Sequence, residues 1–238
     1  MPMMYSLLKH VFVGPTVKRL FPQDIVGLEN IPKKGPVVFA SNHLSVIDSI
    51  LMPLVVKRQV YFLAKAEYFR GKGVKGRMTK WFMTSVGQLP IDRSGGQASQ
   101  SSLDTGVEVL NSGRWLGIYP EGTRSPDGRL YRGRTGIARM LLAADESVPV
   151  IPVVMVGTDK IMPIGAKRPV RGRTGIIFGE PLDFSRYRTM PADRFVLRAI
   201  TDEIMSEIAQ LSDQEYADVY ASTLRKKLDA QRATAAES

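Results

Sequence analysis

A chain of 238 residues with 44% hydrophobic content is long enough to bury a core, and its length favours one α/β domain with at most a small appendage. The absence of cysteine excludes thiolate catalysis, disulfide bonds and zinc sites built on cysteine. Lys and Arg outnumber Asp and Glu by 33 to 23, and the net charge of +10 indicates an anionic partner. Nucleic acid, an acidic membrane surface and phosphorylated metabolites fit this charge equally well.

The N-terminal segment, residues 1–22, is apolar and ends in basic residues. Its apolar run from residue 3 to residue 13 is interrupted by Lys9, so it falls short of the roughly 20 apolar residues that a membrane-spanning helix needs. The segment either lies in a membrane interface, with Lys18 and Arg19 toward the headgroups, or packs as a helix on the core. With no cleavable signal pattern, we expect a peripheral or monotopic protein at the cytoplasmic face of the cell membrane, without a transmembrane helix.

The most informative stretch is a turn between a predicted strand at residues 37–40 and a predicted helix at residues 46–56. Helical positions five apart point about 140° away from each other, so His43 and Asp48 can cooperate only if His43 lies on the loop and Asp48 in the first helical turn. There the carboxylate accepts from one ring nitrogen and leaves the other free as a base. The alternative is a helix capped by Asn42 or Ser45, beside an incidental histidine.

Polar residues also follow three other predicted strands. Lys65 follows the strand at 60–64, and Arg93 follows a short strand that ends near residue 91. The strand at 115–119 runs into Glu121, Gly122, Thr123 and Arg124, where a glycine, a hydroxyl and a guanidinium make an anion cradle. Each position has an ordinary alternative, namely a solvated lysine, a local pair between Arg93 and Asp92, or a turn without function.

Two further stretches have competing interpretations. Residues 71–76 match the dinucleotide pattern G-x-G-x-x-G, but they begin several residues past the strand and lack a suitably placed acidic residue, so we expect no nucleotide there. Cations at residues 70–80 are followed by large apolar side chains, including Trp81. This composition indicates either a membrane interface or a solvated face over a buried Trp81.

The remaining pattern alternates strands with amphipathic helices, the last of which carries Ile200 and Ile204 on its apolar face. It predicts a single layered α/β domain with a largely parallel central sheet flanked by helices. Prolines within the apolar strand at residues 148–156 indicate an edge position or an irregular segment. We place the domain at residues 23–212, and a C-terminal helix and tail, frayed from Thr223 onward, at residues 213–238. The candidate residues all follow strands, so they should meet in a crevice at the carboxyl edge of the sheet.

Four blocks resemble the glycerolipid acyltransferases, in particular the 1-acyl-sn-glycerol-3-phosphate acyltransferase family. They occur in the family's order between residues 36 and 157. The first block is His43 to Asp48, an H-x4-D motif; the others are residues 91–93, the E-G-T-R-S sequence at residues 121–125, and residues 148–153. H-x4-D is a weak signal alone, but E-G-T-R-S at this distance makes the resemblance specific.

The resemblance implies an enzyme of phospholipid synthesis. His43 would act as general base on the hydroxyl of lysophosphatidic acid, with Asp48 orienting it. The hydroxyl would then attack an acyl thioester, either acyl-CoA or acyl carrier protein, to give phosphatidic acid. Arg93 and residues 121–124 would bind the glycerol phosphate, joined by Lys65, and Glu121 would hold Arg93, Arg124 or a hydroxyl. The implied partners are this donor and acceptor and an anionic membrane surface, with no cofactor, metal or nucleic acid.

Alternatives follow from departures in the sequence. Residues 131–136 differ from the family's usual Phe-Lys-Lys-Gly pattern, which leaves glycerol 3-phosphate and other lysophospholipids open as acceptors. A hydrolase lacks its nucleophile, since no G-x-S-x-G elbow is present, and an R-x-x-G-x-G/A pyrophosphate turn starting at Arg70 fails at Lys75. A basic non-enzymatic protein that binds lipid or nucleic acid would not explain why His43, Asp48 and Arg124 lie at strand exits.

Overall fold

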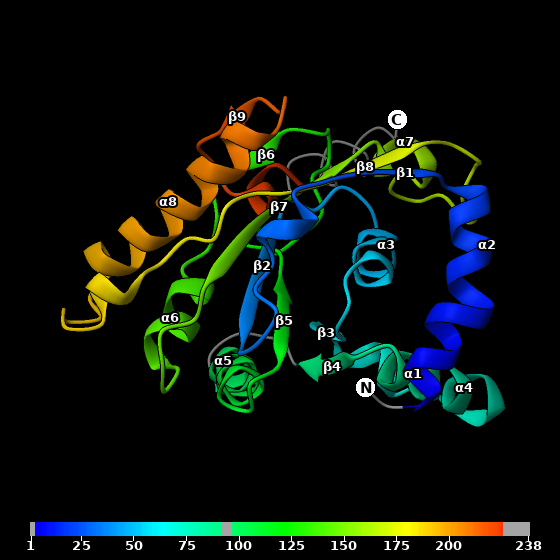
Figure 1. The fold of residues 1–238 in the computed structure, drawn as a ribbon, viewed down its shortest axis with the longest axis horizontal. Coiled ribbons are helices and arrows are strands. Elements are labelled where there is room, and N and C mark those ends of the chain that lie inside the picture. The colour runs from blue at the N-terminus through cyan, green and yellow to red at the C-terminus, as the bar shows by residue number, and fades with distance from the viewer. Residues whose placement is uncertain (1–2, 92–96, 226–238) are drawn as a thin grey trace, which may run out of the picture.

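A mostly parallel sheet forms the centre of the molecule (Figure 1). The computed structural model describes residues 3–91 and 97–225, and in this part of the chain seven strands pair in the order β1-β8-β7-β2-β5-β3-β4. All neighbours are parallel except β7 and β8. These strands are β1 (Gln23–Val26), β2 (Val37–Ser41), β3 (Val60–Lys65), β4 (Gln88–Ile91), β5 (Trp115–Ile118), β7 (Val150–Val156) and β8 (Thr174–Phe178). The predicted layered α/β architecture is confirmed.

Helices cover both faces of the sheet, and a short second ladder pairs β6 (Leu130–Tyr131) with β9 (Tyr216–Ala217). The α-helices are α1 (Met3–Leu7), α2 (Val13–Leu20), α3 (Asp48–Val55), α4 (Gly73–Ser85), α5 (Gln97–Asn111), α6 (Gly136–Ala143), α7 (Thr158–Ile161) and α8 (Arg194–Leu211). A π-helical turn, η1 (Leu8–Phe12), joins α1 to α2, and the 3-10 turns are η2 (Leu28–Asn30), η3 (Ala66–Phe69) and η4 (Ser185–Tyr187). The short strands β1, β6 and β9 have no counterpart among the sequence predictions.

Strand β2 is apolar throughout because both of its faces are buried, as expected in a parallel sheet. Val38 and Ala40 pack in one core with residues of α5, α6 and α8. Val37 and Phe39 pack in a second core with Leu51 of α3. The two sets of helices lie on opposite sides of the sheet in Figure 1. This double burial holds the carboxyl end of β2 in place, and the loop that carries His43 begins there.

The predicted edge position of the proline-containing strand is wrong, because β7 lies between β2 and β8. Pro152 pairs with Ala40 of β2 in register, while its carbonyl oxygen accepts from the Gly179 amide, one residue past the end of β8. A proline is excluded from central strands when its missing N–H would have to donate to a neighbour. The backbone of Pro152 faces β8 at a point just beyond the last residue of that strand. The β7–β8 ladder uses residues 153–156 of β7, so it does not need an N–H group from Pro152.

The N-terminal segment contacts α3, as one of the two interpretations predicted. The Lys9 ammonium donates to the carbonyl oxygens of Pro53 and Val56, and the Tyr5 hydroxyl donates to that of Pro53. The last carbonyls of a helix lack partners within the helix, so Lys9 caps the C-terminal end of α3. Burial lowers the pKa of Lys9 to about 8. No helix in the described part of the chain is long and apolar enough to cross a bilayer.

Candidate active site

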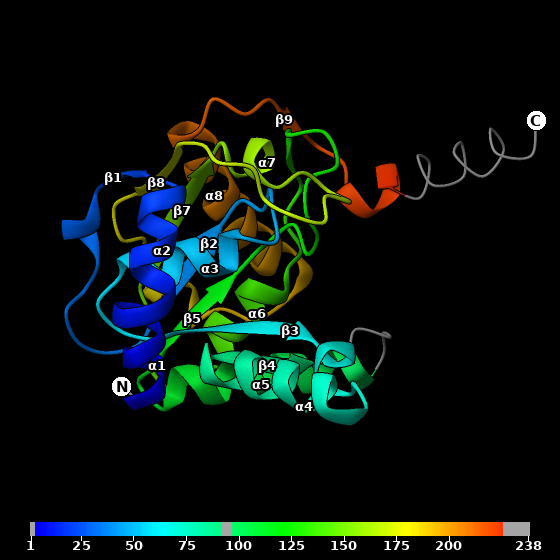
Figure 2. The same ribbon diagram turned by 90° about the vertical axis from the view of Figure 1, so that its right-hand side faces the viewer.

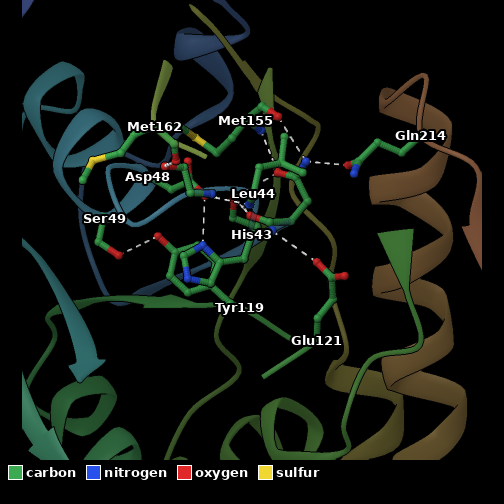
Figure 3. A network of polar contacts seen from close by, with 12 residues as sticks. His43, Leu44, Asp48, Ser49, Tyr119, Glu121, Met155, Met162 and Gln214 are labelled. Carbon is green, nitrogen blue, oxygen red and sulfur yellow. Dashed lines mark hydrogen bonds and ion pairs between the residues drawn. The ribbon is translucent and has the colours of Figure 1, made fainter. Parts of the chain in front are cut away.

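His43 and Asp48 meet at the carboxyl edge of the sheet, directly after β2. Nδ1 of His43 lies 2.9 Å from Oδ2 of Asp48, the first residue of α3 (Figure 3). The histidine ring is 15% exposed, whereas the carboxylate is fully buried. The histidine therefore lies on the loop and the aspartate in the first helical turn, which is the arrangement that the five-residue spacing requires.

The contacts of Asp48 determine which ring nitrogen of His43 carries the proton. Its Oδ2 atom also accepts from the backbone amides of Leu44 and Ser45, each at 2.8 Å. A carboxylate oxygen held by two amide donors acts as an acceptor, so Nδ1 of His43 is the donor in the third contact. The lone pair is then on Nε2, which has no hydrogen-bond partner among the described residues. This ring nitrogen is the one available as a base.

The helix-cap alternative for this turn is wrong. Ser45 directs its hydroxyl to the carbonyl oxygen of Met162 at 2.7 Å, and the Asn42 side chain pairs with both backbone groups of Met155. Neither caps α3, whose N-cap residue, Ile47, forms no side-chain cap in the described structure. The Asn42 side chain instead fixes the loop to β7, and the Ser45 side chain fixes it to Met162, the residue after α7.

The ring of Tyr119, which follows β5, stacks on the ring of His43. The two rings are stacked with centroids 3.7 Å apart and planes 11° apart, and the Tyr119 hydroxyl lies 2.8 Å from that of Ser49 (Figure 3). Burial raises the pKa of Tyr119 well above its ordinary value, so the phenol is neutral. The sequence analysis missed this residue, although its position next to the E-G-T-R-S block was a usable signal.

Both carboxyl oxygens of Glu121 bind backbone amides, and neither binds Arg124, one of the partners predicted for this residue. One carboxylate oxygen accepts from the His43 amide at 3.1 Å and the other from the Tyr131 amide at 2.9 Å. The described structure shows no contact with Arg124, which corrects the prediction, and Arg93 lies outside the described residues. Burial raises the pKa of Glu121 to about 8.

The E-G-T-R-S loop therefore binds both backbone polar groups of His43. Glu121 binds its amide, and the Ser125 amide donates to its carbonyl oxygen at 2.7 Å. Gly122 makes the turn between them with φ of 73°, a left-handed conformation that favours glycine. The arrangement explains why the two blocks, far apart in the sequence, form one site.

The C-terminal segment after α8 also reaches this site, which the sequence analysis did not foresee. Gln214 accepts from the Asn42 side chain at 2.5 Å and donates to the carbonyl oxygen of Gly128 at 2.6 Å. Arg225 donates to the Thr123 hydroxyl at 3.1 Å. The loop of residues 121–134 thus contacts both the sheet edge and this segment.

The predicted binding residues are brought to one edge as far as the structure describes them. Gly122 is exposed and Thr123 half-buried, and the half-buried Arg124 has no hydrogen-bond or ion-pair partner in the described part of the chain. Lys65 is the last residue of β3, next to β5, but its side chain is not described. Arg93 falls within residues 92–96, outside the described ranges. Among the described residues no group of three His, Asp or Glu side chains is placed to hold a metal ion.

Comparisons with known proteins show which family this chain is similar to. A family model described as acyltransferase matches residues 23–156. The chloroplastic 1-acyl-sn-glycerol-3-phosphate acyltransferase of Brassica napus is 33% identical over 180 residues, covering 75% of this chain and 50% of that protein. The 1-acyl-sn-glycerol-3-phosphate acyltransferase of Bacillus subtilis is 29% identical over 188 residues, covering 78% of this chain and 86% of that protein.

The chain spans about half the length of its first two relatives, the Brassica napus protein and a chloroplastic 1-acyl-sn-glycerol-3-phosphate acyltransferase of Arabidopsis thaliana. Among solved structures, the fold matches the 1-acyl-sn-glycerophosphate acyltransferase from Thermotoga maritima with a TM-score of 0.65. The match covers 89% of this chain and 79% of that chain at 24% sequence identity. At this identity the likeness concerns the fold alone.

Proposed function

The chain belongs to the acyltransferase family, and on this premise we propose that it transfers a fatty acyl group from an acyl thioester to the free hydroxyl of lysophosphatidic acid. The product is phosphatidic acid. The observation that carries the proposal is the His43–Asp48 pair: Nδ1 of His43 lies 2.9 Å from Asp48, and Nε2 has no hydrogen-bond partner among the described residues. The names of the relatives support lysophosphatidic acid as the acceptor.

The reaction proceeds by direct transfer, without an acyl-enzyme. Nε2 of His43 takes the proton of the acceptor hydroxyl while its oxygen attacks the thioester carbonyl carbon. The resulting imidazolium is stabilised by the buried carboxylate of Asp48. The tetrahedral intermediate then collapses, the carbon–sulfur bond breaks, and the thiol leaves with the proton from Nε2. The donor, acyl-CoA or acyl carrier protein, is a co-substrate, and we propose no further cofactor.

The acceptor's phosphate lies against the E-G-T-R-S loop in this proposal. The free hydroxyl and the phosphate of lysophosphatidic acid are on neighbouring carbons, so a phosphate site has to lie beside His43. Thr123 and Arg124 lie between the two residues that hold the His43 backbone. The guanidinium of Arg124, which has no partner among the described residues, can fork onto two phosphate oxygens. Lys65 and Arg93 are the further phosphate-binding residues that the sequence predicts.

We also propose that the protein binds the surface of an anionic membrane through α4, at its cytoplasmic face. Val74, Met78 and Trp81 form an apolar stripe on this helix and are 65%, 64% and 52% exposed. The exposed Arg77 and Lys80 flank the stripe. Apolar side chains bordered by cations suit an interface with anionic lipids. Helices α1, α2 and α4 face the viewer together in Figure 2, so α4 lies on the same side of the molecule as the N-terminal helices.

The test measures thiol release from palmitoyl-CoA by the purified full chain, with and without lysophosphatidic acid or glycerol 3-phosphate. Wild type should release thiol only with an acceptor and fastest with lysophosphatidic acid, and phosphatidic acid should appear by mass spectrometry. His43→Ala should lose at least ~10²-fold in kcat, the usual contribution of a positioned base. Arg139→Ala, on an exposed face of α6, serves as the control. Equal release without acceptor would indicate a hydrolase and refute the proposal.

A further inference from the structure

We propose that the C-terminal segment, residues 214–225, supplies Arg225 to the phosphate site of the acceptor and orients Arg134 there. With Arg124, these arginines make the site selective for a phosphate monoester. The inference rests on the proposed function, because it concerns the acceptor of the same reaction. It assigns a binding role to residues outside the blocks that resemble the family.

The C-terminal segment is firmly attached to the loop it covers. Its backbone accepts from the Leu130 amide at 3.0 Å, through Glu215, and from the Arg132 amide at 3.1 Å, through Val219. Strands β6 and β9 pair between these two contacts. Ala221 is fully buried, which places the residues that follow it against the protein. Arg225 therefore approaches the site from a segment with a defined path.

Arg225 contacts the E-G-T-R-S loop at its tip. One of its terminal nitrogens donates to the Thr123 hydroxyl at 3.1 Å. Thr123 lies between Glu121 and Ser125, the residues that bind the amide and the carbonyl of His43. The Arg225 guanidinium is thus held beside Thr123, two residues from each of the loop residues that bind the His43 backbone. Within the described residues this is its one hydrogen bond, and its other N–H groups can donate to an anion.

Arg134 reaches the same loop from the other direction. Its side chain passes so close to Gly122 that a Cβ atom there would lie 3.0 Å from Cδ and Nε of the arginine. The guanidinium donates to the Ser222 hydroxyl at 2.9 Å, and its central carbon is 5.3 Å from the centre of the Tyr220 ring. Two residues of the C-terminal segment therefore orient Arg134 across the exposed Gly122.

The charges of this group are not balanced by the protein. Within the described residues, Arg124, Arg134 and Arg225 form no ion pair, whereas the neighbouring Arg129 pairs with Asp127 at 2.9 Å and Arg132 approaches Asp218 at 3.6 Å. Glu121, the carboxylate inside the loop, is buried and occupied by two backbone amides. Guanidinium groups gathered without counter-charge repel each other, and an anion between them removes that repulsion.

A phosphate monoester has the chemistry that this group fits. It carries close to two negative charges at neutral pH and three acceptor oxygens, and each guanidinium can donate two parallel bonds to it. A phosphodiester headgroup has one charge and fewer free oxygens. The arginines should therefore favour lysophosphatidic acid over lysophospholipids whose phosphate is esterified a second time. A CoA phosphate is also a monoester, so the experiment has to separate acceptor from donor.

The experiment compares Arg225→Ala and Arg225→Lys with wild type and with Arg139→Ala. In Arg225→Ala the KM for lysophosphatidic acid should rise ~10- to 100-fold, as expected for a lost charged hydrogen bond, with kcat changed less than about threefold. Arg225→Lys should lie between the two, because it keeps the charge but not the fork. The preference for lysophosphatidic acid over lysophosphatidylglycerol should fall by a similar factor. Arg139→Ala should match wild type.

Donor binding is separated by repeating the kinetics with S-palmitoyl-N-acetylcysteamine, a thioester that has no phosphate. The effect of Arg225→Ala on the acceptor KM should persist with this donor. An effect confined to the KM of palmitoyl-CoA would assign Arg225 to the donor's phosphate and overturn the inference. Unchanged KM values for all substrates would also overturn it.

A binding measurement separates this inference from the proposed function. Calorimetric titration with glycerol 3-phosphate should show weaker binding by Arg225→Ala than by wild type, whether or not acyl transfer occurs. Wild type that transfers no acyl group but shows this difference would refute the function and leave the anion site standing. Active wild type with equal binding in both variants would refute the anion site alone. If Arg225→Ala lowers the Tm markedly, Arg225→Lys supplies the comparison.

Discussion

Replacing Asp48 by asparagine isolates the charge that the structure places beside His43, the proposed general base. An asparagine oxygen at the position of Oδ2 still accepts from His43, Leu44 and Ser45, so the ring keeps its orientation. What is lost is the negative charge, 2.9 Å from Nδ1, when Nε2 takes the acceptor's proton. With an effective dielectric constant of about 20, that charge stabilises an imidazolium by roughly 4 to 6 kcal/mol.

The Asp48 charge stabilises the ring only when the ring is protonated, in the transition state, so its loss should lower kcat. At 1.36 kcal/mol for each factor of ten, we expect Asp48→Asn to lower kcat by ~10³-fold or more. The KM values for donor and acceptor should change less than about threefold. The assay is thiol release from palmitoyl-CoA at saturating lysophosphatidic acid. A loss smaller than about tenfold would show that Asp48 does not stabilise charge on the ring.

Folding and mechanism are checked in the same experiment. The second oxygen of Asp48 is buried without a partner among the described residues, so the asparagine amide placed there should cost ~1–3 kcal/mol of stability. A thermal melting curve shows at which temperatures the variant is folded, and its activity is measured at one of these. In the double variant with His43→Ala, Asp48→Asn should cause no further loss of activity, because the two residues act as a unit. An additional large loss would mean that Asp48 acts independently of the ring.

Three further predictions concern Glu121, Tyr119 and Trp81. The pKa of Glu121 is raised from 4.5 to about 8. Between these pH values the folded state holds a proton that the unfolded state releases. The free energy of unfolding should therefore fall between pH 4.5 and pH 8, by up to about 5 kcal/mol. Urea titrations should show that Glu121→Gln flattens this fall, and parallel pH curves would contradict the reasoning. Tyr119→Phe, which keeps the stacked ring, should retain kcat within about threefold, whereas Tyr119→Leu should lose roughly tenfold or more; equal rates would show that stacking does not position His43. Trp81→Ser should weaken sedimentation with anionic vesicles ~10-fold or more, while Phe195→Ser, at an 80% exposed residue of α8, should not; equal effects would exclude a specific role for α4.

Local patterns in the sequence determined the α/β class and the turn that brings His43 to Asp48. The continuous apolar run of β2 indicated a strand buried on both faces, and helical geometry required His43 on the loop and Asp48 in the first turn of α3. The structure has both features. These inferences succeed because each depends on residues a few positions apart, whose relation is fixed by backbone geometry.

Tertiary structure alone decided the contacts that complete the site. One partner of Glu121 is an amide 78 residues away, and one partner of the Asn42 side chain is Gln214, 172 residues away. The interior position of β7 likewise depends on where β8 ends, which the prolines within β7 do not reveal. Periodicity reports which face of an element is buried but not which distant element covers it, because that depends on how all the elements pack together. The role of the C-terminal segment could therefore be found only once the sheet edge was assembled.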